Sequence, residues 1–567
     1  MSYQENFQKW ADFSELPDYL KNELNAMDEH IKEDAFYTSL AFGTAGQRGL
    51  IGAGTNRMNI YTARETTEGL ARLMDTKGDA KKRGVAIAYD SRHFSREFAF
   101  DAARVLALHD IPSYVFESLR PTPELSFAIR ELGTLTGVMI TASHNPAAYN
   151  GYKVYGEDGG QMPPEDADQL TAFINEIDNI FTIALADEDS ELITVIGDEI
   201  DQKYLENVKS VTINQKIIDD FGKNLNIVFT PLHGTGEMLG RKTLAQAGFE
   251  KIAVVEEQAI PDGDFPTLKS PNPENQAAFE YSEKLGRKVD ADMLVATDPD
   301  ADRIGVEVRL PSGDYQPLSG NQIGAVLAKY ILEAHKTAGT LPENAAVVKS
   351  IVSTELVTAI TKSYGVKMIN VLTGFKFIAE QIQEFEETGS QTYMMGFEES
   401  FGYLIKPFVR DKDAIQALLL ICEVAAYYKS QGKTLYDGIQ DIYAEYGYYK
   451  ENTISVTLEG IDGAAQIKAV MDKFRQNTPT AFNGVAVVLT EDFLENTATD
   501  AAGTVTKMTT PPSNVLKYHL ADGSWIAVRP SGTEPKIKFY LAAVAETSDA
   551  SDEKLVNFET EIQEFIK

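Results

Sequence analysis

The stretch GVMITASHNPAAYNGYK, residues 137–153, begins with a short apolar run and changes at once to polar side chains. The run 137–140 has the composition of a buried strand. The loop that follows it contains Ser143, His144 and, further on, Lys153. In parallel α/β sheets, ligands gather at the carboxyl ends of the strands. The stretch therefore predicts an α/β fold in which Ser143 lies at a ligand-binding edge.

The same pattern recurs along the chain. Helix-like spacing, as in 98–110, separates apolar runs that end in polar, Gly- or Asp-rich loops. Alternating strands and helices of this kind require βα units and a mainly parallel sheet. Since the loops differ in chemistry, we expect three domains that each contribute a loop to one cleft. The other strand-like segments are GVAIAYD (84–90), NIVFTPLHGTG (226–236), ADMLVATDPDADR (291–303) and YMMGFEES (393–400).

A chain of 567 residues is too long for one core and predicts about three to five domains. An acidic run at 186–191 and the polar helix after it predict the end of a first domain. A Pro- and Gly-containing segment at 310–320 predicts the second boundary, and AEYGYYKEN (444–452) the third. The C-terminal portion mixes helix-like and strand-like segments, as an α+β domain does. The predicted domains are 1–205, 206–317, 318–446 and 447–567.

The charge balance and the absence of targeting signals restrict the class of protein. With 85 acidic and 52 basic residues, the formal charge is −33, which repels nucleic acid and anionic membranes. The longest apolar stretch, 414–428, is shorter than the ~20 residues that span a bilayer, so we expect a buried helix. The N-terminus has no signal or transit peptide, and the single cysteine, Cys422, excludes an internal disulfide. We expect a cytoplasmic monomer or dimer without nucleic-acid or membrane partners.

DPDADR (298–303) contains three acids at alternate positions after a strand, Asp298, Asp300 and Asp302. On extended backbone such residues share a face, so their carboxylates would converge on a hard cation such as Mg²⁺. An EF-hand is excluded because Arg303 and Arg309 occupy its glycine and glutamate positions. A solvated acidic turn, and a phosphatase with Asp298 as nucleophile, remain alternatives. Mutual repulsion of three acids favours the metal.

Three further segments suggest ligand contacts. In RPSGTEPKIKFY (529–540), small residues and Arg529 suit a phosphate site, or a turn between two strands. No Walker pattern accompanies it. GFEES (396–400) offers carboxylates to sugar hydroxyls, or caps a helix start. FGTAGQRG (42–49) is more typical of a structural turn.

Ser143 has three candidate roles: acyl-transfer nucleophile, phosphate carrier or turn residue. The nucleophile elbow G-x-S-x-G is absent. We expect His144 to point away from Ser143, because neighbours on an extended strand face opposite sides. A phosphate carrier needs a metal and hydrogen-bond donors, which the Asp triplet, the lysine and the Arg-Ser-Gly-Thr loop supply. Ser143 is therefore predicted to carry phosphate.

The four motifs, in this order, closely resemble those of the α-D-phosphohexomutase family. TASHNP resembles its phosphoserine loop, DPDADR its metal loop, GFEES its sugar-recognition loop and RPSGTEPK its phosphate-binding loop. The resemblance extends from FGTAGQRG to RPSGTEPK, almost the whole chain. It implies four domains around a central cleft, the first three of similar α/β topology with mixed sheets and the fourth α+β.

The resemblance also implies site residues. Ser143 would carry phosphate and bind Mg²⁺ together with Asp298, Asp300 and Asp302. Lys153 aligns with a lysine that is proposed to transfer protons in the family, a role that requires a lowered pKa. Arg303 and His144 are the other catalytic residues implied. The residues implied for substrate binding are Thr44, Arg48, Thr373, Gly374, Lys376, Glu398, Ser400, Lys412, Arg529, Ser531, Gly532 and Thr533.

The implied activity is that of an isomerase. It would interconvert α-D-glucose 1-phosphate and D-glucose 6-phosphate through a phosphoserine and a glucose 1,6-bisphosphate intermediate. Two departures, Phe397 in GFEES and Pro299 in DPDADR, resemble the longer branch of the family that contains bacterial phosphoglucomutases and phosphopentomutases. Alternatives are a phosphopentomutase or phosphomannomutase, an Mg-dependent sugar-phosphate phosphatase, and a non-catalytic sugar-phosphate sensor.

Overall fold

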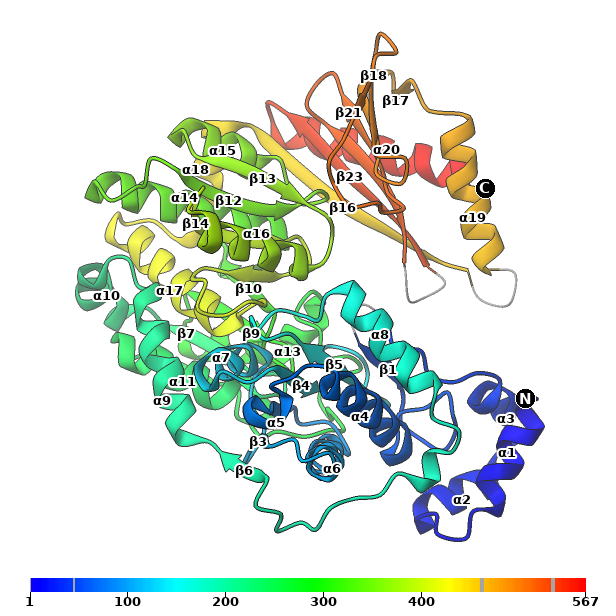
Figure 1. Cartoon of the computed structure of the whole chain (residues 1–567). Coiled ribbons are helices and arrows are strands. Elements are labelled where there is room, and N and C mark those ends of the chain that lie inside the picture. The colour runs from blue at the N-terminus through cyan, green and yellow to red at the C-terminus, as the bar shows by residue number, and fades with distance from the viewer. Residues whose placement is uncertain (1, 44–45, 459–462, 532–535, 567) are drawn as a thin grey trace.

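The structure is a computed structural model that describes residues 2–43, 46–458, 463–531 and 536–566. Its strands form four main sheets that follow one another along the chain, each with its own helices (Figure 1). Three of these sheets mix parallel and antiparallel pairs, and the fourth is antiparallel. The prediction of three mixed α/β domains and a fourth α+β domain is confirmed, whereas the predicted domain limits stay predictions.

The first sheet has the strand order β1-β5-β4-β2-β3-β6. Successive side chains of a strand point to opposite faces, so both faces of this sheet are covered. Val85 and Ile87 pack against α4, α6 and α8, while Ala86 and Ala88 pack against α7 and α9. The elements are β1 (Gln47–Leu50), α4 (Ile60–Asp75), α5 (Ala80–Arg83), β2 (Val85–Tyr89), α6 (Ser95–Leu108), β3 (Ser113–Phe116), α7 (Thr122–Leu132), β4 (Thr136–Ile140), β5 (Tyr149–Tyr155), α8 (Pro164–Asn175), β6 (Ile193–Ile196) and α9 (Asp198–Val208).

The second sheet has the order β11-β10-β9-β7-β8. Its strands β9 and β10 are antiparallel, and the Asp triplet lies in the turn between them. The segment 310–320, predicted as a boundary, contributes an edge strand, because β11 pairs with β10. The elements are α10 (Gln215–Phe221), β7 (Ile227–Thr230), α11 (Gly236–Ala247), β8 (Ile252–Val254), α12 (Glu256–Ala259), α13 (Glu280–Val289), β9 (Met293–Thr297), β10 (Ile304–Arg309) and β11 (Tyr315–Pro317).

The third sheet has the order β13-β12-β14-β15. The apolar stretch 414–428 forms the buried helix α17, as predicted, and its Glu423 accepts a hydrogen bond of 2.6 Å from Tyr330. No helix in the described part of the chain is long and apolar enough to cross a membrane. The elements are α14 (Gly320–Ala338), β12 (Ala345–Ser350), α15 (Leu356–Tyr364), β13 (Lys367–Val371), α16 (Phe375–Thr388), β14 (Thr392–Glu398), β15 (Gly402–Leu404), α17 (Ala414–Ser430) and α18 (Leu435–Tyr446).

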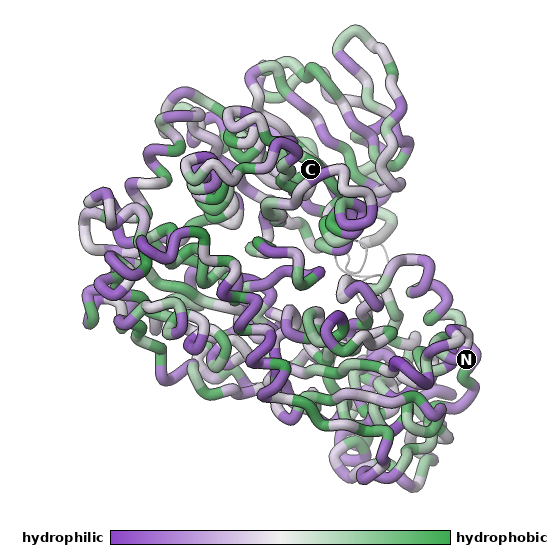
Figure 2. Tube along the Cα trace, turned by 60° about the vertical axis from the view of Figure 1, so that its left-hand side comes forward, coloured by the Kyte–Doolittle hydropathy of each residue, from purple (hydrophilic) through white to green (hydrophobic). Residues whose placement is uncertain are grey.

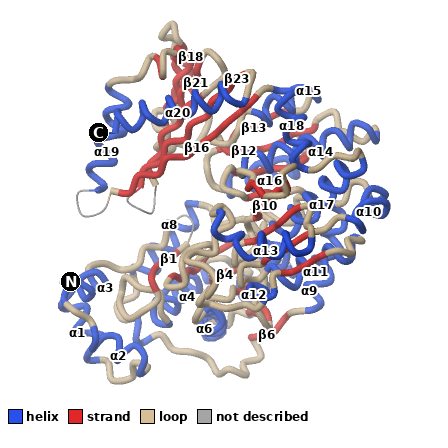
Figure 3. Tube along the Cα trace, turned by 180° about the vertical axis from the view of Figure 1, so that it is seen from behind, coloured by secondary structure: helices blue, strands red, loops and turns tan. Residues whose placement is uncertain are grey.

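The fourth sheet has the order β16-β23-β22-β21-β18-β19-β20, and β17 pairs with β18. Within the segment 444–452, where the third boundary is predicted, only Gly447 separates α18 from the long strand β16. Figure 3 shows β16 running alongside the other long strands of this sheet. The elements are β16 (Tyr448–Thr457), α19 (Gly463–Gln476), β17 (Ala481–Phe482), β18 (Val485–Asp492), β19 (Thr497–Asp500), β20 (Val505–Lys507), β21 (Leu516–Leu520), β22 (Trp525–Pro530), β23 (Lys536–Ala545) and α20 (Ser548–Ile566).

Three helices precede the first sheet: α1 (Tyr3–Asp12), α2 (Asp18–Ala26) and α3 (Glu29–Phe36). The sequence analysis did not predict them. Trp10 of α1 makes an edge-to-face contact with Phe36 of α3. It joins these helices to the rest of the first domain through the same kind of contact with Tyr61 and Phe181. Figure 1 shows these helices on the side of the molecule next to β1 and α4.

One hydrophobic cluster extends through the first three domains, and the fourth domain has a cluster of its own. One cluster contains Phe127 of the first domain, Phe229 of the second and Phe397 of the third. A separate cluster around Phe474 fills the fourth domain, which meets the third at a further, smaller cluster. Figure 2 accordingly shows hydrophobic residues, in green, in every part of the trace. The fourth domain is thus attached to a body formed by the other three.

Glu307 of β10 is a buried acid whose two carboxylate oxygens have no hydrogen-bond partner among the described residues. Burial, reinforced by the charge of Glu283, raises its pKa from 4.5 to about 8. Folding therefore takes up a proton between these two values, so stability falls as the pH rises through this window and levels off above it.

We expect Glu307→Gln to melt a few degrees higher than the unaltered protein at pH 8.5, with the difference closing toward pH 5. Thermal melts at a series of pH values measure this. Glu250→Gln, which changes an exposed acid of the same domain, is the control. A difference in melting temperature between Glu307→Gln and the unaltered protein that stays the same at every pH would contradict a neutral, buried carboxyl at Glu307.

Candidate active site

Ser143 lies in the serine loop, which we define as residues 141–146, directly after β4. Its backbone φ is +51°, a left-handed conformation that is strained for a residue with a side chain. The Ser143 hydroxyl donates a hydrogen bond of 2.8 Å to Oδ2 of Asp298. The serine of the first domain and the Asp triplet of the second are therefore in direct contact.

His144 does not point away from Ser143, and that expectation was wrong. Its Nδ1 lies 3.2 Å from the Ser143 hydroxyl, because the backbone at Ser143 is left-handed and not extended. Burial, together with the charges of Arg303 and Arg48, holds the pKa of His144 well below its usual value. The imidazole beside the serine is therefore neutral.

Arg92 holds the serine loop in place, and sequence reasoning missed it. Its buried guanidinium donates to the carbonyl oxygens of Ser143 (2.6 Å) and Pro146 (2.9 Å), as well as to those of Asn145 and Tyr149. Asp90, its neighbour, accepts 2.6 Å from the Thr141 hydroxyl, which in turn accepts from the Ser143 amide. The sequence AYDSR (88–92) could have indicated it, because β2 ends there in a polar loop at the same edge of the sheet as the serine loop.

The Asp triplet converges, but not for the predicted reason. The loop from Asp298 to Asp302 is a turn with Ala301 at φ +49°, and Oδ1 of Asp298 accepts the backbone amides of Asp302 (3.1 Å) and Arg303 (3.0 Å). The three side chains are buried, and each offers a carboxylate oxygen within 4.8 Å of the others. The convergence comes from this turn, whereas an extended segment was expected.

The donor set fits a divalent cation. Oδ1 of Asp300 and Oδ1 of Asp302 are buried and lack a hydrogen-bond partner within the described ranges. Burial and the two neighbouring carboxylates raise the pKa of Asp298 well above its usual value. Unpartnered carboxylate oxygens in this arrangement are ligands that hard cations prefer. The triplet is therefore able to bind a metal ion.

Two lysines lie against the triplet. Lys153 of β5 donates 2.8 Å to Asp300 and lies 3.7 Å from Asp302, while Lys412 lies 3.1 Å from Asp302. Burial lowers the pKa of Lys153, but the charges of Asp300 and Asp302 outweigh it, so the net pKa is raised. The residues around Lys153 therefore do not give it the lowered pKa that is expected of a proton-transferring lysine. Thr122, which sequence reasoning also missed, donates 2.9 Å to Asp300.

The sugar loop, residues 396–400, lies next to the metal loop, residues 298–303. Arg303 forms an isolated β-bridge with Gly402, just beyond the sugar loop, and its guanidinium pairs with Glu274. Glu398 is buried and accepts 2.7 Å from the Gly374 amide. Ser400, the other predicted sugar contact, is partly buried in the turn after Glu398.

The remaining predicted residues are less tightly connected to the serine. Arg48 donates 3.0 Å to Asn145 of the serine loop. Lys376 lies over the Phe377 ring, and the Thr373 hydroxyl is buried without a partner in the described chain. In the fourth domain, Arg529 lies 3.4 Å from the Tyr540 hydroxyl, and the Ser531 amide donates to the Lys536 carbonyl. Predicted residues outside the described ranges are Thr44, Gly532 and Thr533.

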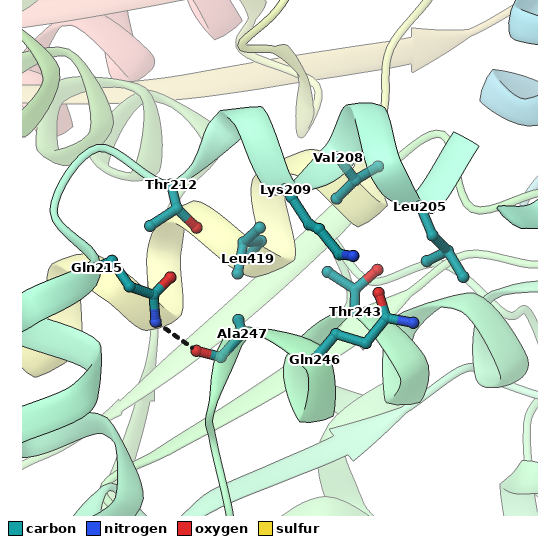
Figure 4. A pocket seen from close by; sticks show the side chains of 9 residues that line it. All are labelled: Leu205, Val208, Lys209, Thr212, Gln215, Thr243, Gln246, Ala247 and Leu419. Carbon is teal, nitrogen blue, oxygen red and sulfur yellow. Dashed lines mark hydrogen bonds between the residues drawn. The ribbon is translucent and has the colours of Figure 1, made fainter. Parts of the chain in front are cut away.

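A pocket elsewhere in the molecule contains none of the predicted residues. Figure 4 shows it between α9, the short 3₁₀ turn Lys209–Val211, α11 and α17, with Gln215 donating 2.8 Å to the Ala247 carbonyl. Its cavity volume is about 120 Å³. The active-site geometry rests on the loops described above and not on this pocket.

Comparison with known proteins places the geometry in context. Four domains described as phosphoglucomutase/phosphomannomutase domains I, II, III and C-terminal match residues 39–181, 202–310, 319–446 and 459–558. A phosphoglucomutase of Staphylococcus epidermidis is 40% identical over 542 residues, 94% of this chain and 96% of the relative.

Solved structures share the fold. Parafusin, a Paramecium phosphoglucomutase in an open form, has a TM-score of 0.69 at 19% identity and covers 94% of this chain and 95% of its own. An N-acetylphosphoglucosamine mutase of Aspergillus fumigatus, solved with GlcNAc-6P and magnesium, has a TM-score of 0.52 at 14% identity over the full length of both chains.

The four-domain fold, with a serine hydroxyl hydrogen-bonded to an Asp triplet that is able to bind a metal ion, is that of a phosphosugar mutase, which is an isomerase. The chain belongs to the phosphoglucomutase/phosphomannomutase family. The resemblance to the α-D-phosphohexomutases, and to their bacterial phosphoglucomutase branch, is confirmed.

Proposed function

We propose that the chain acts as a phosphoglucomutase, interconverting α-D-glucose 1-phosphate and D-glucose 6-phosphate. The observation that carries this proposal is the 2.8 Å hydrogen bond from the Ser143 hydroxyl to Asp298 of the buried triplet. It occurs in a chain that is 40% identical, over almost its whole length, to a relative named phosphoglucomutase. Phosphopentomutase and phosphomannomutase activity by the same chemistry are the nearest alternatives.

In the proposed reaction, phosphorylated Ser143 transfers its phosphoryl group to the free sugar hydroxyl. The bond between Ser143 Oγ and phosphorus breaks, a bond from phosphorus to the sugar oxygen forms, and the hydroxyl proton ends on Ser143 Oγ. The product is glucose 1,6-bisphosphate, whose other phosphoryl group then returns to Ser143 in the reverse sense. Lys153, kept protonated by the charges of Asp300 and Asp302 that raise its pKa, gives a proton to Ser143 Oγ and receives the proton of the sugar hydroxyl. Neutral His144, 3.2 Å from Oγ, orients the hydroxyl.

The triplet Asp298, Asp300 and Asp302 would hold Mg²⁺, which when bound neutralises charge on the phosphoryl group. Arg303 and Lys412 supply fixed positive charge at the same edge, Lys412 at 3.1 Å from Asp302. These cations offset the overall charge of −33, which otherwise repels an anionic substrate.

Substrate binding is assigned to loops of the first, third and fourth domains. Glu398 and Ser400 hold the sugar hydroxyls in either orientation of the bisphosphate. The C-terminal loop binds the phosphate that is not reacting, so either end of the intermediate meets the same donors. The residues assigned to that phosphate are Arg529, Ser531, Gly532 and Thr533, and further contacts come from Thr44, Arg48, Thr373, Gly374, Lys376 and Lys412.

A phosphatase with Asp298 as nucleophile is less well supported. Oδ1 of Asp298 accepts two backbone amides, and Oδ2 accepts the Ser143 hydroxyl. Both oxygens are therefore engaged within the protein, whereas the Ser143 hydroxyl has a neutral imidazole 3.2 Å away.

Purified protein assayed on glucose 1-phosphate, mannose 1-phosphate and ribose 1-phosphate tests the proposal. Each assay contains Mg²⁺ and the matching bisphosphate. We expect glucose 1-phosphate to be preferred in kcat/KM by at least about tenfold. We also expect EDTA to abolish turnover and added Mg²⁺ to restore it. A preference for ribose 1-phosphate contradicts the assignment of the sugar, and release of inorganic phosphate as the main product contradicts the mutase.

A further inference from the structure

The turn between β12 and α15 links the sugar loop to the fourth domain. We call residues 350–355, with the sequence SIVSTE, the coupling turn. On one side, Lys517 of β21 reaches across the domain boundary to it. The Lys517 ammonium donates 2.7 Å to the Ile351 carbonyl and lies 3.1 Å from Glu355, and the side chain is almost completely buried.

Glu355 is shared by two buried lysines. Lys349 of β12 also lies 3.1 Å from its carboxylate and donates 3.2 Å to the Ser353 carbonyl. Burial, together with the charge of Lys517, lowers the pKa of Lys349 to about 8. Burial raises the pKa of Glu355, but the two lysines outweigh it and hold the net pKa below its usual value. Loss of Glu355 would leave two buried lysines without their carboxylate, and loss of Lys517 would remove the contact that the fourth domain makes with Ile351 and Glu355.

On its other side, the coupling turn holds the sugar loop. Glu399, next to the proposed sugar ligand Glu398, turns its carboxylate back to the hydroxyls of Ser350 (2.9 Å) and Ser353 (3.3 Å). The Ser353 hydroxyl also accepts the Glu399 amide at 3.1 Å. Of the two adjacent glutamates, Glu399 is thus tied to the turn.

The same turn is packed into the fourth domain. Ile351 and Val352 share an apolar cluster with Trp525 and Tyr540, and the Lys517 ammonium lies 4.6 Å from the centre of the Trp525 ring. The Tyr540 hydroxyl contacts Arg529, the predicted phosphate ligand. A chain of contacts therefore runs from the phosphate-binding strand through the turn to the sugar loop.

We infer that the coupling turn, held by Lys517 and Glu355, makes the sugar loop and the phosphate-binding loop bind substrate as one unit. Lys517, Glu355 and Ser353 are positioning residues, since they act through Glu399 and the fourth domain. The inference rests on the proposed function of these two loops. The contact between the third and fourth domains then does more than hold the domains together. A shift of the fourth domain would also move the coupling turn, to which the sugar loop is bonded.

Lys517→Met tests the inference by removing the charge that crosses the boundary. The substrate and the transition state both contain the phosphate that the fourth domain binds. The variant therefore weakens the binding of both states equally. We expect KM for glucose 1-phosphate to rise about tenfold, and kcat to stay within about threefold. The matched control is Lys554→Met, which removes a 2.6 Å ion pair to Asp522 inside the fourth domain and leaves KM unchanged.

Trp525 provides a second readout. The chain has two tryptophans, so Trp10→Phe leaves Trp525 as the sole reporter, placed at the domain boundary. We expect glucose 1-phosphate to change its emission in the Trp10→Phe background, and Lys517→Met to remove most of that change while Lys554→Met does not.

Ser353→Ala removes two of the three hydrogen bonds between the coupling turn and Glu399 and leaves the one from Ser350. It replaces Lys517→Met as the test if that variant does not fold. We expect it to raise KM as well, and the two changes together to raise KM by less than the product of their separate effects. An unchanged KM and an unchanged Trp525 response in Lys517→Met, or effects that multiply fully, would overturn the inference. Absence of turnover by the unaltered enzyme instead contradicts the proposed function, because it appears before any variant is compared.

Discussion

Ser143→Ala is expected to lower mutase turnover by about 10⁴-fold or more, because it removes the oxygen that carries the phosphoryl group. The hydroxyl is held by Asp298 at 2.8 Å and the backbone around it by four carbonyl contacts from Arg92, so no neighbouring hydroxyl takes its place. The alanine variant keeps the serine loop, since the bonds that shape the loop do not involve the lost oxygen.

Two measurements check this result: coupled turnover of glucose 1-phosphate, and the mass of the intact protein after incubation with glucose 1,6-bisphosphate. The unaltered protein is expected to gain one phosphoryl group, and the alanine variant none. Ser91→Ala is the matched control, since Ser91 lies in the adjacent loop and its hydroxyl has no partner within the described residues. Substantial turnover by Ser143→Ala would falsify the serine carrier, and release of inorganic phosphate by this variant would favour an aspartyl phosphatase.

The strands and the chemistry of their loops were predictable because they depend on local composition. The apolar runs before Ser143, Asp298 and Glu398 form β4, β9 and β14. The first two strands end where the predicted polar loop begins, whereas β14 continues into GFEES and ends at Glu398. Buried strands need uninterrupted apolar residues, and this requirement is visible without knowledge of the rest of the fold. The pairing of Ser143 with the triplet, by contrast, followed from chemistry that needs both groups together.

Loop conformation was not predictable in the same way. Left-handed backbone at Ser143 and Ala301 decides where His144 and the aspartates point, and neither residue is a glycine that would signal it. Arg92 and Thr122 act through contacts that are 51 and 178 residues distant in sequence, at Ser143 and Asp300. Such long-range partners have no local pattern.

Lys153→Met is expected to lower kcat by about 10³-fold, within the range for loss of a positioned proton carrier. Lys153 is buried and donates 2.8 Å to Asp300, so its removal also leaves that carboxylate without its cation. Lys429→Met is the matched control, because it removes a lysine with a 2.7 Å ion pair to Asp292 far from the serine loop in the chain.

Lys153→Arg separates the two contributions, since arginine keeps the positive charge but does not release its proton near neutral pH. If Lys153 moves the hydroxyl proton, Lys153→Arg loses activity nearly as fully as Lys153→Met, with the Mg²⁺ concentration for half-maximal rate unchanged. The charges of Asp300 and Asp302 raise the pKa of Lys153, which is also what a lysine that only neutralises the triplet would show. The arginine variant distinguishes this electrostatic role from proton transfer. Retention of most of the activity by Lys153→Arg would assign that electrostatic role and transfer the proton to another group, with His144 at 3.2 Å from the serine oxygen as the nearest candidate.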